Sequence, residues 1–198
     1  MGVSIPAWAY EFHGHKCPFM PLGYRMGIIA LRELGLDRIK DHDAIALTEM
    51  GIHPQNCMND GIQIATGCTY GKLTMEKLHY GKAAFVLYHP ERGAVRVAVK
   101  AEFFGRLNRF RFFSEYRVKG IEPSFIPEEV ADETIEFVLN TPEEEAFIIQ
   151  RLPDFQFKHP PSSFKKDVCE SCGEMVFESY LRFKDGKMLC IPCSGYRA

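Results

Sequence analysis

Residues 83–101 have the sequence AAFVLYHPERGAVRVAVKA, and this stretch decides the fold. Two apolar runs, 83–88 and 95–101, flank the turn-forming segment Glu91-Arg92-Gly93, which predicts a β-hairpin. In the second run three valines alternate with polar or small residues, as expected for a strand with one exposed face. Similar runs at 44–48 and 72–78 add further strands. We therefore expect a sheet that is rich in antiparallel pairs.

Helices are predicted on both sides of these strands. Apolar residues recur at helical spacing over 21–34, and a second helix is expected over 55–65. Gly23 and Gly27 lie one turn apart in the first helix, so another backbone could approach it closely. The acidic stretch 127–150 is also predicted to be helical. Adjacent strands joined by turns, with packed helices at either end, indicate an α+β fold and not a βαβ repeat.

The composition limits the classes of function. Lys and Arg total 24 and Asp and Glu total 26, giving a net charge of −2 in 198 residues, so nucleic-acid binding is not expected. A basic, aromatic segment at 105–119 precedes the acidic stretch. The two segments are expected to face each other or water. The alternative is that the basic segment binds an anion or a partner. The chain shows neither a signal peptide nor an apolar run long enough for a membrane helix. We expect a soluble, cytoplasmic protein without a membrane partner.

The C-terminal region predicts a separate zinc-binding module. Cysteines at 169, 172, 190 and 193 follow the spacing C-x2-C-x17-C-x2-C, which is typical of structural zinc sites: Cys169, Cys172, Cys190 and Cys193. Disulfides or free thiols are the alternatives. A hairpin around Asp185-Gly186 would bring the two pairs together. We expect a core domain over 1–158, a Pro/Ser linker over 159–166, and a zinc-ribbon or treble-clef-like module over 167–198. Its balanced charge favours contact with protein.

A second group of metal-ligating residues lies near the N-terminus. His13, His15 and Cys17 fall within five residues, and the position of Cys17 before a predicted helix favours its thiolate form. Imidazole and thiolate ligands suit zinc, and Cys57 completes a candidate core site. Cys68 lies in a turn bracketed by glycines, where backbone could approach a ligand. Ordinary packed or surface residues remain the alternative for each.

Five motifs together resemble the FmdE family, which is named after a component of formylmethanofuran dehydrogenase. They are HGHKCP at 13–18, LGYRMG at 22–27, Cys57-x-x-Asp60-Gly-Ile-Gln63, TGCTYGK at 66–72 and HYGKAAF at 79–85. The C-terminal cysteine pattern is similar to the zinc module of many members. The resemblance implies an α+β core that is usually dimeric, a zinc-finger tail, and association with a molybdenum or tungsten enzyme that reduces carbon dioxide onto methanofuran.

The resemblance also marks candidate residues of the core site. They are His13, His15, Cys17, Cys57, Asp60, Thr66, Cys68 and Lys72, of which Cys17, Cys57, Asp60, Cys68 and Lys72 are the candidates for catalysis. The chain departs from the family at Phe19, where Gly commonly follows the Cys-Pro pair. A bulky ring at that position would narrow a pocket.

Three hypotheses of function follow. The first is a homodimeric, metal-binding accessory or regulatory protein of the FmdE type, with structural zinc in the tail and a metal or thiol site in the core. The second is a zinc- or thiol-dependent enzyme that acts on a small molecule. There a three-ligand zinc would activate water with Asp60 or a free histidine as general base, or Cys17 or Cys57 would be the nucleophile paired to a neighbouring imidazole. The third is a zinc-finger protein associated with transcription.

Overall fold

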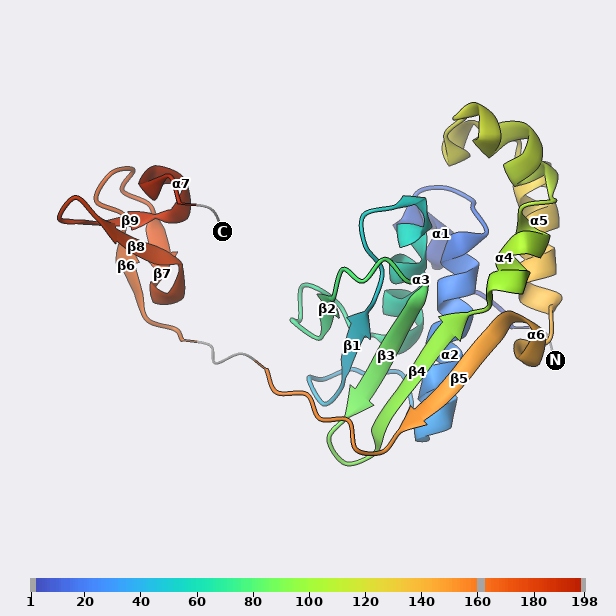
Figure 1. Cartoon of the computed structure of the whole chain (residues 1–198), viewed down its shortest axis with the longest axis horizontal. Coiled ribbons are helices and arrows are strands. Elements are labelled where there is room, and N and C mark those ends of the chain that lie inside the picture. Colours follow the sequence, from blue (N-terminus) through green and yellow to red (C-terminus); the bar gives the residue numbers. More distant parts are fainter. Residues whose placement is uncertain (1–2, 160–162, 197–198) are drawn as a thin grey trace. The chain divides into compact units, whose positions relative to one another are not determined.

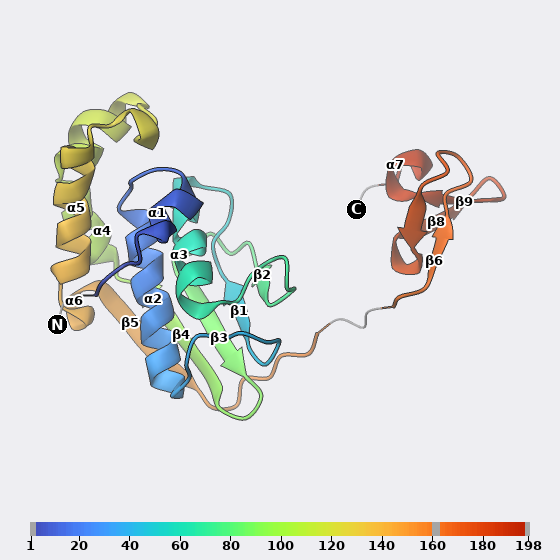
Figure 2. The ribbon, with the colours of Figure 1, turned by 180° about the vertical axis from the view of Figure 1, so that it is seen from behind.

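The computed structural model describes residues 3–159 and 163–196 and places them in two compact units, Met1–Phe157 and Lys158–Ala198. Each unit is considered by itself. Residues 160–162 of the predicted linker lie outside the described residues. In the first unit a five-stranded sheet carries the helices α2 (Phe19–Leu34) and α3 (Cys57–Thr66) against one face (Figures 1 and 2).

The sheet has the strand order β2-β1-β3-β4-β5, and its centre is the predicted hairpin. The register from Ala84↔Ala98 to His89↔Gly93 confirms that β3 and β4 form an antiparallel pair. The strands are β1 (Ile45–Thr48), β2 (Met75–Lys77), β3 (Ala84–His89), β4 (Gly93–Val99) and β5 (Phe147–Leu152).

Two features of the sheet differ from the expectations. β2 pairs in parallel with β1, and the helix α3 (Cys57–Thr66) crosses over between them, so the sheet holds one βαβ unit. β5 pairs antiparallel with β4 in a region that was expected to be helical. Helix ends there after α5 (Glu128–Asn140) and the single turn α6 (Glu143–Ala146). β5 is an edge strand whose side chains are mostly exposed. Its sequence therefore lacks the alternation of apolar and polar residues that would predict a strand.

The remaining helices surround the sheet and its helical layer. α1 (Trp8–His13) and α2 (Phe19–Leu34) lie at the N-terminal end, and the 3₁₀ turn η1 (Pro54–Asn56) leads into α3. After β4 come α4 (Ala101–Leu107), the π-helical turn η2 (Phe112–Tyr116) and the 3₁₀ turns η3 (Arg117–Lys119) and η4 (Pro123–Phe125).

Close packing of α2 on α3 positions the site described below. A Cβ placed on Gly23 would lie 2.0 Å from the Met58 carbonyl oxygen, and one placed on Gly61 would lie 2.0 Å from the Met20 carbonyl oxygen. Only glycine permits these approaches. The predicted use of Gly27 also holds, since a Cβ there would lie 2.6 Å from the Cβ of Ala65.

The two faces of the sheet bury different clusters. On the helical face, Phe85, Leu87 and Val97 pack with Met26 and Ile62 of α2 and α3 in the main hydrophobic core. The opposite face holds a smaller cluster that is closed by the segment after β5: Ile45, Leu47, Val86, Tyr88 and Ala94 with Phe155 and Phe157. Because alternate residues of each strand point to opposite faces, one short strand serves both clusters.

The second unit is built from two hairpins and a terminal helical turn. β6 (Lys166–Val168) pairs with β7 (Met175–Phe177), and β8 (Leu181–Lys184) pairs with β9 (Lys187–Cys190). The 3₁₀ turn η5 (Glu178–Tyr180) joins the hairpins, and α7 (Ile191–Ser194) follows β9. The predicted Asp185-Gly186 turn is present, with positive φ at both residues. No helix in the described part of the chain has both the length and the apolar character that crossing a bilayer requires.

Candidate metal centres

Four side chains gather at the N-terminal ends of α2 and α3. One ligand atom from each of His13, His15, Cys17 and Cys57 lies within 4.8 Å of the other three. His13 ends α1 and Cys57 begins α3, while the other two lie in the loop before α2. Gly14, with φ of 84°, reverses the chain between the histidines, whose ring centroids are 4.3 Å apart. The structure thus brings together all four residues proposed for the core site.

A carboxylate supports the first of these residues. Asp60 Oδ2 lies 2.8 Å from His13 Nδ1, and Gln63 Nε2 donates to the other carboxylate oxygen at 3.3 Å. Nδ1–H therefore donates to Asp60, which leaves the Nε2 lone pair facing the cluster, 3.4 Å from Cys17 Sγ. Carboxylate–histidine pairs of this kind orient metal ligands in many proteins. Asp60 is therefore positioned to hold His13.

The second histidine offers a nitrogen without a partner. His15 Nε2 is buried and has no hydrogen-bond partner within the described residues. A buried polar atom left unpaired is costly, and a metal ion would satisfy it. The donor set of two imidazoles and two thiols is one that zinc prefers. The residues present therefore fit a zinc ion.

The titratable groups of the cluster are coupled to one another, and a metal ion that binds here would displace the protons from its ligand atoms. The hydrogen bond with Cys17 lowers the pKa of Cys57 to about 4, with His13 adding to the effect against the opposing influence of burial. The same hydrogen bond and burial raise the pKa of Cys17. Their mutual hydrogen bond, together with the deeper burial of Cys17, therefore favours Cys57 over Cys17 as the thiolate of the pair. Burial opposes protonation of His13, but Asp60 and Cys57 outweigh it and raise its pKa to about 9.

The other candidates lie at the far end of α3. Cys68 follows the helix that Cys57 begins, and a ten-residue helix is about 15 Å long. Cys68 is fully buried, with its Sγ 3.7 Å from the Ala44 carbonyl oxygen. Thr66 caps this turn, donating to the Ile62 carbonyl oxygen and accepting from the Cys68 N–H. Lys72 Nζ donates to the Lys40 and Asp41 carbonyl oxygens. These residues stabilise the α3–β2 connection and do not join the cluster.

The second unit gathers the four C-terminal cysteines. Their sulfur atoms lie within 4.8 Å of one another, as the spacing predicts. Backbone N–H groups point at them: Cys190 N donates to Cys169 Sγ at 3.3 Å, and Cys193 N donates to Cys190 Sγ at 3.4 Å. Hydrogen bonds of this kind, the one from Cys190 foremost, lower the pKa of Cys169 to about 6. Four thiols so gathered could hold one metal ion and fill all four positions of a tetrahedral site.

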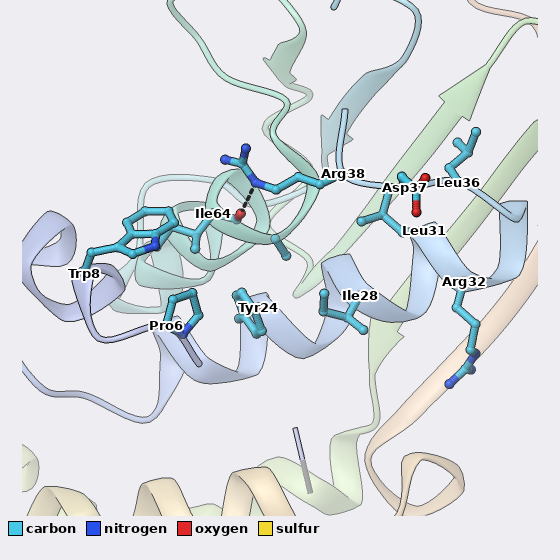
Figure 3. A pocket seen from close by; sticks show the side chains of 11 residues that line it. Pro6, Trp8, Tyr24, Ile28, Leu31, Arg32, Leu36, Asp37, Arg38 and Ile64 are labelled. Carbon is cyan, nitrogen blue, oxygen red and sulfur yellow. Dashed lines mark hydrogen bonds between the residues drawn. The ribbon is translucent and has the colours of Figure 1, made fainter. Parts of the chain in front are cut away.

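A groove of about 400 Å³ runs along the outer side of α2 and is lined mainly by apolar side chains (Figure 3). Pro6, Trp8 and Tyr24 lie at one end, and Leu36 and Asp37 lie toward the other. Its two arginines already have partners: Arg38 Nε donates to the Ile64 carbonyl oxygen, and Arg32 pairs with Glu143. Apart from these two arginines and Asp37, the side chains that line the groove are apolar or aromatic.

Comparison with known proteins agrees with this architecture. A family model described as "FmdE, Molybdenum formylmethanofuran dehydrogenase operon" matches residues 12–148, which include the core cluster. The chain belongs to the FmdE family. The model of the prokaryotic dksA/traR C4-type zinc finger matches residues 162–197 of this FmdE protein. The predicted pairing of an α+β core with a C-terminal zinc finger is thus confirmed.

Two individual proteins are similar to this FmdE chain. A probable S-adenosyl-L-methionine-binding protein from Archaeoglobus fulgidus is 32% identical over 201 residues, covering 94% of this chain and 51% of that protein. The chain thus spans about half the length of that relative. The crystal structure of a tungsten formylmethanofuran dehydrogenase FmdE-like protein from Syntrophus aciditrophicus matches with a TM-score of 0.59 at 22% identity. The match covers 94% of this chain and 88% of the Syntrophus aciditrophicus chain. At this identity the match shows that the two proteins share a fold.

Proposed function

We propose that this FmdE protein is a metal-binding accessory or regulatory component of a formylmethanofuran dehydrogenase-type complex. The observation that carries the proposal is the core cluster of two histidines and two cysteines, with Asp60 behind His13. The family description, which refers to the operon of that dehydrogenase, supports the choice of partner. One-carbon metabolism is the setting that follows from it.

The donor set favours a structural or sensing role over catalysis. His13, His15, Cys17 and Cys57 would hold one zinc ion, and four protein ligands fill a tetrahedral site. A zinc ion held by these residues would supply positive charge and a rigid geometry, and it would stabilise both cysteines as thiolates. A hydrolytic enzyme keeps one coordination position open for water, so the zinc-dependent enzyme becomes the better alternative only if one of the four does not bind.

Metal analysis of variants tests the core centre. The full chain should contain two zinc ions, and Cys17→Ser should contain one. Cys68→Ser is the matched control, because Cys68 is equally buried but lies outside both clusters, and it should keep two. Unchanged zinc content in Cys17→Ser would refute the core ligands, and loss of zinc in Cys68→Ser would implicate general unfolding.

The C-terminal module supports a contact with protein. Large apolar side chains are exposed on it, among them Phe164, Phe177 and Phe183. Its Lys and Arg residues are nearly balanced by Asp and Glu, so attraction to phosphate is weak. The dksA/traR zinc-finger match keeps the transcription-associated alternative open for test. Binding to DNA that persists at 150 mM salt would favour that alternative.

The relative from Archaeoglobus fulgidus suggests a second candidate function, the binding of S-adenosyl-L-methionine. The similarity extends over 94% of this chain, which includes both units. Isothermal titration of the zinc-loaded chain with this compound tests the suggestion directly. A Kd in the micromolar range would support it, and no heat of binding at millimolar concentration would exclude it.

Three further expectations complete the proposal. We place the domain boundaries at 1–158 and 167–198, with 159–166 as the linker, and we propose a cytoplasmic homodimer. Sedimentation equilibrium at micromolar concentration should give twice the mass of the 22.6 kDa chain. A monomer under these conditions would remove the homodimer from the account.

A further inference from the structure

A second cavity, of about 380 Å³, is lined in part by residues close in sequence to the core ligands but uses none of these ligands. Phe19 follows Cys17 by two residues, and Gln55 precedes Cys57 by two, so both cavity walls continue from the cluster. The loop before β3 and the segment after α4 complete the lining, which comprises Phe19, His53, Gln55, Gly81, Asn108, Phe113 and Arg117. This size is within the range of small-molecule sites.

His53 lines this cavity and carries an unsatisfied hydrogen-bond donor, which a small rotation of the ring would bring to the cavity surface. Its Nδ1 accepts from the Gln55 N–H at 3.3 Å at the start of η1, which assigns the ring proton to Nε2. Nε2 is buried and has no hydrogen-bond partner in the described part of the chain. A buried N–H without an acceptor carries a desolvation penalty, and an acceptor oxygen in the cavity would remove it.

Arg117 brings a positive charge to the same cavity. Its side chain is 23% exposed, and its Nη1 donates to the Ile121 carbonyl oxygen at 2.5 Å and lies 3.9 Å from Glu122 Oε2. Both contacts use a single nitrogen, whereas a guanidinium carries five N–H donors in a planar fork. Such a fork matches the geometry of carboxylate and phosphate oxygens. The polar groups of the cavity therefore suit an anion.

The rest of the lining is apolar and aromatic. The rings of Phe19 and Phe113 have centroids 5.5 Å apart at 52°, and together they form a wall suited to a flat apolar group. Phe113 belongs to the π-helical turn η2, and such turns occur frequently at functional sites. The loop that supplies Gly81 also holds His79 at a φ of 54°, a conformation that concentrates at ligand-binding regions.

We propose that this cavity binds a small organic anion with an apolar, flat body. Its carboxylate or phosphate oxygens accept from His53 Nε2 and from the Arg117 guanidinium. Its body lies against Phe19 and Phe113. The inference goes beyond the proposed metal centre, because neither polar contact uses one of the four core ligands. A ligand held there would contact Phe19 and Gln55, which lie two residues from the core ligands Cys17 and Cys57.

Nuclear magnetic resonance titration of the full, zinc-loaded chain tests the proposal with defined probes. Benzoate and phenyl phosphate represent the two anionic groups, and benzyl alcohol is the neutral control. At least one of the anions should saturate with a Kd below about 5 mM, while benzyl alcohol should not saturate. Which anion binds more tightly identifies the preferred acceptor group. Failure of both anions to saturate would overturn the proposal.

Matched variants locate the binding. His53→Asn keeps a side-chain oxygen that can accept from the Gln55 N–H but removes the Nε2–H donor. Arg117→Met removes the charge. Each should weaken anion binding by about tenfold or more. The exposed residues Arg111 and His42 provide the controls Arg111→Met and His42→Gln, which should bind within twofold of the parent chain. Equal binding by all four variants would refute the site.

One more variant separates this inference from the proposed metal centre. Cys17→Ser removes a core ligand but neither of the anion contacts, so its Kd for the anion should change by less than about tenfold. If it retains both zinc ions and anion binding, the core centre fails and the cavity proposal stands. If anion binding is absent from the parent chain while the zinc content is two, the cavity proposal fails and the metal centre stands.

Discussion

His13 Nδ1 and Asp60 Oδ2 lie 2.8 Å apart although 47 residues separate them in the sequence. The imidazole is almost fully buried, with 4% of the side chain exposed, while the Asp60 side chain is 36% exposed. The carboxylate therefore holds the ring from its outer side and directs the opposite nitrogen inward, toward Cys17. This contact couples the packing of α1 on α3 to the geometry of the candidate metal centre.

Replacement of this carboxylate should weaken metal binding without unfolding the chain. In Asp60→Asn we expect the zinc affinity of the core centre to fall by about 10- to 100-fold, because the supporting group loses its charge. Competition with a chromophoric chelator measures the change. Asp43→Asn, at an exposed site, is the control and should bind zinc like the parent chain. Equal affinities in both variants would show that Asp60 does not orient His13.

Two glycine substitutions should have opposite effects on stability, one at the close contact of α2 with α3 and one at an open position of α4. Gly23→Ala should destabilise the first unit by about 1–3 kcal/mol or more, because its Cβ would lie 2.0 Å from the Met58 carbonyl oxygen. Gly105→Ala in α4 adds a Cβ in open space and should stabilise by about 0.5–1 kcal/mol. Urea denaturation measures both. A neutral Gly23→Ala would contradict the packing described.

Two arginines of α2 should differ sharply in their contribution to stability. Arg25 is buried and donates to the Val138 and Thr141 carbonyl oxygens at the end of α5. Arg25→Met leaves both carbonyls without this donor, so we expect a loss of about 2–4 kcal/mol. Arg32→Met breaks an exposed ion pair with Glu143 and should cost less than about 1 kcal/mol. Similar losses in the two variants would contradict this assignment.

Chelation should affect the two units differently. The buried cluster of the second unit consists of Cys169, Leu189 and Cys190, too small a core to fold without metal. A strong chelator should collapse the resonance dispersion of residues 163–196 while the β3–β4 resonances of the first unit remain. Cys172→Ser should have the same effect as the chelator. Retention of a dispersed spectrum in the second unit under chelation would contradict a structural metal.

Much of the fold follows from local sequence patterns. The β3–β4 hairpin, the helices α2 and α3 and the C-terminal cysteine cluster each depend on residues close in sequence. β5 could not be predicted in this way, because Ile148 and Ile149 are exposed and the strand forms only through pairing with β4. The parallel pairing of β1 and β2 is likewise a long-range contact, made across α3.

In the candidate site, too, some residues could be predicted from local sequence, and others come together only through long-range packing. The spacing of His13, His15 and Cys17 within five residues is visible in the sequence. Cys57 is a distant candidate in the sequence, and the packing of α2 on α3 brings it to the other three. The far position of Cys68 and Lys72 also follows from that packing, since α3 separates them from the cluster. His53 gave no sequence signal, because the cavity that it lines is assembled from four distant segments.

Anomalous scattering at the zinc absorption edge from crystals of the full chain tests the central claim most directly. The account predicts two peaks per chain, one among the four C-terminal sulfurs and one enclosed by His13, His15, Cys17 and Cys57. A single peak at the C-terminal cysteines, with the core cluster empty in zinc-loaded protein, would contradict the account.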